Sequence, residues 1–108
     1  MVSALRDAYE LISDEEHWCQ RFICTDADGR LCLFVEAVRF CASGAAAKCN
    51  MSLLENDALA AAAVTLFPEI PSPSWSALAP VIWVNDVLGH TAIMQVFEKA
   101  IVELEGSL

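Results

Sequence analysis

The stretch Val81-Ile-Trp-Val-Asn-Asp-Val-Leu-Gly-His90 joins a proline-rich segment to a strongly periodic helix. Its apolar run stops at Asn85 and Asp86, whose side chains favour turns, and Gly89 allows the chain to reverse. Thr91 is then expected to cap the last helix. We expect residues 81–84 to form a short strand or an extended lead-in, and we interpret the whole stretch as a structural hinge.

Outward from this stretch, apolar residues at helical spacing predict helices over residues 1–12, 38–49 and 91–104, and a capping box followed by an alanine-rich run that ends at Pro68 predicts one over residues 52–67. Ser13 with Glu16 and Ser52 with Glu55 have the spacing of capping boxes. The four prolines of residues 68–80 predict a loop there, held on the core by Trp75 and Leu78.

A β-hairpin is the other expected element. Residues 22–25 and 31–34 are rich in strand-forming side chains, and Asp28-Gly29 between them suits a tight turn. Because an isolated hairpin is marginally stable, it must pack against the helices. The sequence therefore predicts one compact domain over residues 1–108, α+β but mainly α, with about four helices packed around one short hairpin.

The charge and the composition limit the possible partners. The formal net charge is −9, from 15 acidic and 6 basic residues, which disfavours direct binding to nucleic acid or to anionic membranes. Such a surface suits a basic protein partner, although it also serves solubility alone. The hydrophobic share of 56% indicates either a homodimer interface or a dense core. With neither a secretory signal nor an unbroken apolar span, we expect a cytoplasmic protein without membrane contact.

The cysteines do not form a metal-binding pattern. Cys19, Cys24, Cys32, Cys41 and Cys49 lack the close pairs that structural zinc uses, and their number is odd. In a hairpin, Cys24 and Cys32 could face each other, either as two ligands or as small buried hydrophobes. We expect reduced thiols, no metal and no cofactor.

Two interpretations apply to the chemically capable side chains. Cys41 near the start of a helix, with Asp86 or Asn85 orienting His90 as a base, would make a catalytic thiol set. The local sequence matches no cysteine-hydrolase signature, so turn and cap roles for Asn85, Asp86 and His90 are favoured. Trp18 is a further candidate for contact with a ligand or partner, or an anchor in the core.

Four short motifs occur in a characteristic order along the chain: Trp18-Cys19, Asp26-Ala-Asp-Gly29, Arg39-Phe-Cys-Ala-Ser-Gly-Ala45 and Trp83-Val-Asn-Asp86. This set resembles a family of small bacterial and phage proteins classed as a domain of unknown function. Phe40 stands where tryptophan is common, and Val84 is inserted between Trp83 and Asn85. The resemblance implies one compact, mainly helical domain and transfers no catalytic residue.

For function we therefore expect a small acidic, non-enzymatic interaction or accessory protein, of a kind associated with phages or mobile elements. It would bind a protein partner, for which a basic surface is suited, and form a dimer. Trp18, Asn85, Asp86 and His90 are the candidate binding residues. The alternative is a small enzyme or ligand-binding domain that uses Cys41 with Asn85, Asp86 and His90.

Overall fold

A computed structural model of the chain describes residues 3–71 and 77–106. Trp75, expected to hold the proline-rich loop on the core, lies outside these residues. The α-helices of the described part are α1 (Ser3–Ser13), α2 (Ala42–Lys48), α3 (Leu53–Leu66), α4 (Ala79–Trp83) and α5 (His90–Gly106). Shorter elements are the 3₁₀ turns η1 (Glu15–His17) and η2 (Phe34–Glu36), the π-helical turn η3 (Val84–Leu88), and the strands β1 (Cys24–Thr25) and β2 (Arg39–Phe40). The α+β, mainly α fold class is thus confirmed.

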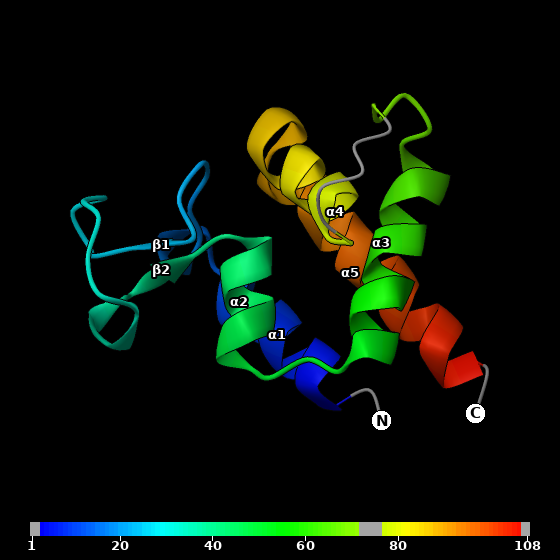
Figure 1. Cartoon of the computed structure of the whole chain (residues 1–108), viewed down its shortest axis with the longest axis horizontal. Helices are drawn as coiled ribbons and strands as arrows, with labels where there is room; N and C mark the ends of the chain where they lie inside the picture. The colour runs from blue at the N-terminus through cyan, green and yellow to red at the C-terminus, as the bar shows by residue number, and fades with distance from the viewer. Residues whose placement is uncertain (1–2, 72–76, 107–108) are drawn as a thin grey trace.

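The helices pack in pairs around an aliphatic core. α3 lies along α5, α1 packs against both α2 and α5, and α4 closes on α3 (Figure 1). Fully buried side chains come from each pair, including Leu5 of α1, Leu59 of α3 and Phe97 of α5. Ala62 and Ala63 of α3 are also fully buried. Their small side chains let neighbouring elements approach α3 closely.

Glu55 joins α3 to α1 from inside the protein. The predicted capping box is confirmed: Ser52 Oγ accepts from the Glu55 backbone N–H, and Glu55 Oε1 accepts from the Ser52 N–H at 2.9 Å. The other carboxylate oxygen accepts from the backbone N–H of Leu5 at 2.7 Å. Burial by itself would raise the pKa of Glu55, but the N–H groups of Ser52 and Leu5 stabilise the ionised form and lower it below the ordinary value of 4.5.

The strand pairing differs from the predicted hairpin. β1 pairs with β2 in an antiparallel register, with Cys24 opposite Phe40, and not with residues 31–34. The turn itself lies as expected, because the Asp26 N–H donates to the carbonyl of Arg30. Residues 31–38 form a further excursion with the turn η2. Since residues 39–40 belong to β2, the helix expected over 38–49 begins at Ala42.

One short helix and the starts of two further elements also differ from the sequence-based expectation. Residues 79–83 form α4, with Pro80 in its first turn, where the missing proline N–H costs no helical hydrogen bond. α5 begins at His90, ahead of the expected cap Thr91. Asp14, not Ser13, caps the turn η1, because Asp14 Oδ1 accepts from the Glu16 N–H at 2.9 Å.

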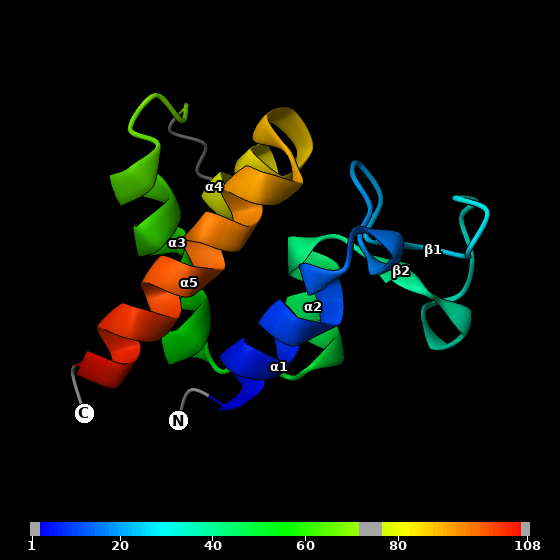
Figure 2. The same ribbon diagram turned by 180° about the vertical axis from the view of Figure 1, so that it is seen from behind.

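The strands lie at one end of the molecule, on the far side of α2 from α3 and α5 (Figures 1 and 2). We call residues 21–40 the arm, and the other described residues together the body. The arm is anchored where α2 begins: the Cys41 N–H donates to the carbonyl of Ile23, and the Cys19 N–H donates to the carbonyl of Phe40.

Candidate functional site

Asn85 is fully buried and connects three parts of the chain. Its Oδ1 accepts from Trp18 Nε1 at 2.8 Å and from the backbone N–H of Ala42 at 3.0 Å. Its Nδ2 donates to the carbonyl of Cys19 at 3.1 Å and to Asp86 Oδ1 at 2.9 Å. One amide therefore holds η3, the segment after η1 and the start of α2 together, with both of its polar atoms satisfied.

The turn η3 is what directs Asn85 into the protein. It continues from α4, and the Gly89 N–H donates to the carbonyl of Val84, five residues earlier, which is the π-helical pattern. Gly89 ends the turn with a φ of +98°, a conformation that favours glycine. The turn inferred from the sequence is therefore present, but it is helical, and residues 81–84 are not a strand.

The residues around Asp86 fix the base of the arm. Gln20 Nε2 donates to the carbonyls of Asn85 and Asp86 at 3.1 and 3.2 Å. Asp86 Oδ1 accepts from the backbone N–H of Arg21 at 2.9 Å, and Arg21 has a φ of +74°. A left-handed backbone is unfavourable for arginine, and these hydrogen bonds hold it there.

His90 connects α5 to the end of α1. Its Nε2 lies 2.7 Å from the carbonyl oxygen of Ile12, and its ring meets the ring of Trp18 edge-on at 5.1 Å between centroids. Trp18, Asn85, Asp86 and His90, which the sequence singles out, thus lie in one contact network. Its partners are backbone groups and neighbouring rings, so the observed role of these side chains is to position chain segments.

Cys41 is nine-tenths buried and caps α2. Its Sγ accepts from the Gly44 N–H at 3.3 Å and lies 3.5 Å from Ser43 Oγ. A hollow of about 220 Å³ is lined by both Cys41 and Asp86, together with Arg21, Phe22, Ile23, Ser43 and Ile82. His90 does not line this hollow, and its ring is engaged with Ile12 and Trp18. The suggested set of Cys41, Asp86 and His90 therefore does not line this hollow together.

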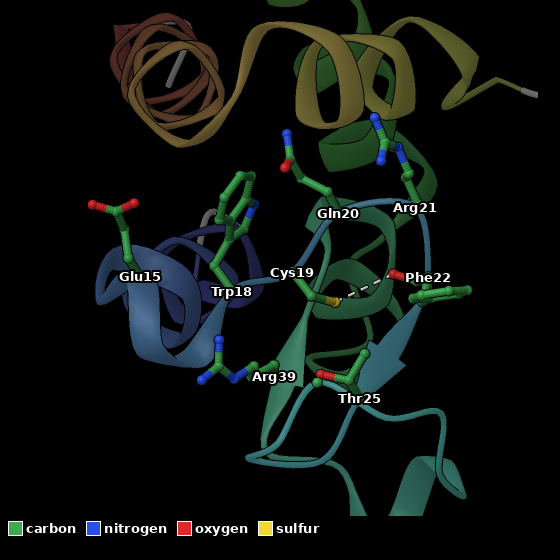
Figure 3. Close-up of a pocket in the computed structure, with 9 residues that line it drawn as sticks. Glu15, Trp18, Cys19, Gln20, Arg21, Phe22, Thr25 and Arg39 are labelled. Carbon is green, nitrogen blue, oxygen red and sulfur yellow. Dashed lines mark hydrogen bonds between the residues drawn. The ribbon is translucent and has the colours of Figure 1, made fainter.

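A larger pocket of about 440 Å³ opens beside the base of the arm (Figure 3). Its lining includes Trp18, Cys19 and Arg39, and Arg39 extends away from Arg21, so the two guanidinium groups do not converge. Cys19 Sγ donates to the carbonyl of Phe22 at 3.3 Å. Burial, and then the nearby Cys41, Cys24 and Asp86, raise the pKa of Cys19 to about 12. A thiol that stays protonated at neutral pH is a poor nucleophile and a poor metal ligand.

The thiols are free in the described part of the chain, and no group of three or more His, Cys, Asp or Glu side chains there is arranged to hold a metal ion. Cys24 and Cys32 do approach each other, since Cys24 Sγ donates to the carbonyl of Cys32 at 3.7 Å. Within the same described residues, no helix combines the length and the apolar character needed to cross a membrane.

The arm carries a feature that sequence reasoning missed. Of the thirteen exposed large hydrophobic side chains in the described ranges, six belong to the arm and seven are spread over the much longer body. The six are Phe22, Ile23, Leu31, Leu33, Val35 and Val38. Leu31 and Leu33 are 68% and 67% exposed and Val35 is 84% exposed. The run from Leu31 to Phe34 is apolar enough to predict a buried strand, whereas in the structure Leu31 and Leu33 are exposed and Phe34 packs against Phe40.

A family model described as a family of unknown function (DUF6197) matches residues 2–103. No curated protein and no solved structure matches the chain. The family match spans nearly the whole sequence, including the Trp18–Asn85 network and the arm, and it assigns an activity to neither. On this match, the protein belongs to the DUF6197 family of unknown function.

Proposed function

We propose that this protein is a non-enzymatic interaction module that contacts other proteins through its arm. The observation that carries the proposal is the exposure of Phe22, Ile23, Leu31, Leu33, Val35 and Val38 on a segment of twenty residues. Single exposed hydrophobic residues are ordinary on protein surfaces, but a concentration of them on one projecting segment is typical of a contact surface. Burying apolar area contributes about 25 cal/mol per Å², so these exposed side chains favour association of the arm.

The non-enzymatic part of the proposal is supported by how the candidate catalytic groups are used. Asn85 makes hydrogen bonds to Trp18, Ala42, Cys19 and Asp86, and it has no exposed surface. A general base must reach the proton that it removes. His90 instead lies against a backbone carbonyl, away from the hollow that Cys41 lines.

The charge distribution supports a class of partner. Three acidic and three basic residues lie within residues 21–40, so the arm has no net charge and the remainder of the chain carries the full −9. Asp14, Glu15 and Glu16 are exposed at the base of the arm. A heterologous partner that covers the arm and also meets this rim is therefore a basic protein, whose approach the acidic body accelerates. Nucleic acid is repelled by the same charge.

The experiment compares two triple variants of the full chain. The arm variant carries Leu31→Ser, Leu33→Ser and Val35→Ser, and the body variant carries Leu53→Ser, Val64→Ser and Val102→Ser, which are also exposed. Complexes recovered from the native host with each chain are identified, and each component is then purified and recombined. We expect a defined complex with wild type and the body variant that the arm variant fails to form.

The enzyme alternative has a separate readout. It requires Cys41 to be more reactive than the other thiols, whereas Cys41 is 7% exposed and Cys32 and Cys49 are more accessible. We expect timed alkylation, followed by peptide mapping, to label Cys41 more slowly than Cys32 and Cys49. Preferential labelling of Cys41 in the folded protein would favour the enzyme instead.

A further inference from the structure

We propose that the partner seated on the arm is a second copy of this chain, in a symmetric arm-to-arm dimer. This inference rests on the proposed function, because it names the occupant of the same surface. Four features of the arm support the dimer: its net charge, its charged groups outside the ion pairs of the described residues, its place in the fold and its size.

Charge limits where two copies can meet. Each chain carries −9, and all of that excess lies outside residues 21–40. Contact between two bodies would bring like charges together, whereas contact between two arms joins surfaces of zero net charge. Because the arm lies at one end of the molecule, an arm-to-arm dimer leaves the two bodies on opposite sides of the contact (Figures 1 and 2). Charges separated by more than about 8 Å are largely screened at physiological ionic strength.

Within the described residues, no charged group of the arm takes part in an ion pair. The ion pairs in the described ranges, Arg6 with Glu105 and Lys99 with Glu103, all lie in the body. Arg30, Asp28 and Glu36 are exposed beside the apolar side chains, and none of them takes part in those pairs. In a twofold dimer the same surface serves both copies, so Arg30 of one copy can pair with Asp28 or Glu36 of the other.

The surface has the composition and the size of a dimer interface. Interfaces have an apolar centre with a polar rim, and the arm places Leu31, Leu33 and Val35 among Asp28, Arg30 and Glu36. A standard interface engages about 20–30 residues on each side. Seventeen residues of the arm are at least partly exposed, and with the neighbouring Trp18–Gln20 segment they make twenty, the lower end of that range.

The test is sedimentation equilibrium of the untagged full chain in reductant, from 1 to 200 μM, with the arm and body variants defined above. Wild type and the body variant are expected to be dimers at the upper concentrations. The arm variant is expected to dissociate at least about 100-fold more readily, since three exposed apolar anchors are removed. Far-UV circular dichroism of the three proteins should coincide, because the substituted side chains are exposed.

Salt adds a second readout. Raising sodium chloride from 50 to 500 mM should change the dimer little, because screening of the repulsion between the two bodies offsets the weakening of the Arg30 pairs with Asp28 or Glu36. A complex held by a basic partner should weaken over the same range.

The proposal is overturned if wild type stays monomeric at 200 μM, or if the arm variant dimerises as wild type does. It is also overturned if the body variant becomes monomeric. A monomeric wild type that forms an arm-dependent complex with another protein leaves the proposed function standing and removes the dimer. If the arm variant keeps every association that wild type makes, both the dimer and the proposed function are overturned.

Discussion

The side-chain amide of Asn85 is a central contact of the fold, because it satisfies polar groups from three segments of the chain. Replacing it with alanine leaves Trp18 Nε1, the Ala42 N–H and the Cys19 carbonyl without their partner. Each unsatisfied buried group costs about 1–3 kcal/mol, and such costs are not additive. We therefore expect Asn85→Ala to lower the free energy of unfolding by about 3 kcal/mol, measured by urea denaturation.

Asp86→Asn is the matched control for this substitution. An asparagine at 86 keeps an oxygen that can accept from the Arg21 N–H and from Asn85 Nδ2, so the loss should stay below about 1 kcal/mol. Equal losses at the two positions would show that Asn85 has no special position in the network.

Glu55 makes the stability of the protein depend on pH in a defined direction. Its pKa is lower in the folded protein than the ordinary value of 4.5, so the unfolded chain takes up the proton first as the pH falls. The stability that ionised Glu55 supplies is therefore complete above pH 4.5 and is lost as the pH falls through its lower folded-state pKa. Wild type should exceed Glu55→Gln in stability at pH 7, and this difference should shrink in urea titrations below pH 4.5.

Glu10→Gln serves as the comparison for Glu55→Gln, because Glu10 is an exposed residue of α1. Its stability relative to wild type should show a much weaker dependence on pH in the same range. A Glu55→Gln difference that is constant from pH 7 to pH 3 would contradict the assigned role of the buried carboxylate.

Some contacts of individual residues were predictable from the sequence and others were not. The Ser52–Glu55 capping box was predictable, because both partners lie within one turn of helix. The contacts of Glu55 with Leu5 and of Asn85 with Trp18 were not, because they join residues 50 and 67 positions apart. The sequence singles out Trp18, Asn85, Asp86 and His90 as a set, and it is their partners that only the fold reveals.

At the scale of elements, the close approach of α2 to the arm sets the arm's direction. A Cβ atom built on Gly44 would lie 2.1 Å from the carbonyl oxygen of Ile23, which is backbone and cannot rotate away. Gly44→Ala must therefore push β1 away from α2. We expect a loss of about 2–3 kcal/mol in the free energy of unfolding, the upper part of the range for overpacking.

Gly106→Ala tests whether that loss is due to crowding. A Cβ at Gly106 meets no atom within 4 Å, so alanine there should leave stability unchanged or raise it by up to about 1 kcal/mol. Amide hydrogen exchange adds a local measurement, since Gly44→Ala should speed exchange at the Cys41 N–H, which donates to Ile23. Unchanged exchange and stability in Gly44→Ala would contradict the packing of the arm on α2.

Long helices were more predictable than the strands. The stretches containing α1 and α5 have apolar periodicity over several turns, and α3 is marked by its capping box and alanine-rich run, so local pattern and tertiary packing agree. The strand partner of residues 22–25 depends on tertiary contacts, since Leu31 to Phe34 is as apolar as the true partner, Arg39-Phe40. The short helix α4 was mistaken for a loop or strand because its single apolar run has no period to measure.

At the scale of the whole molecule, the excess of negative charge was evident from composition, but its placement was not. Counting shows −9, whereas only the fold shows that the segment without net charge is a separate projection with exposed apolar side chains. The sequence left open whether the hydrophobic excess belongs to a core or to an interface. The structure uses most of it in the core of the body and leaves a distinct portion exposed on the arm.

The concentration of negative charge on the body predicts how salt changes the stability of the fold. The acidic residues of the body repel one another in the folded state, and salt screens that repulsion. In the arm variant, chosen so that association does not contribute, raising sodium chloride from 20 to 300 mM should stabilise the fold by about 1 kcal/mol, or about 4–8 °C in Tm. Adding Asp7→Asn and Glu10→Gln, two exposed carboxylates of α1 outside the ion pairs of the described residues, should reduce this salt response. Thermal denaturation followed at 222 nm measures both proteins, and a fall in Tm with salt in the arm variant would show that its charges are net stabilising.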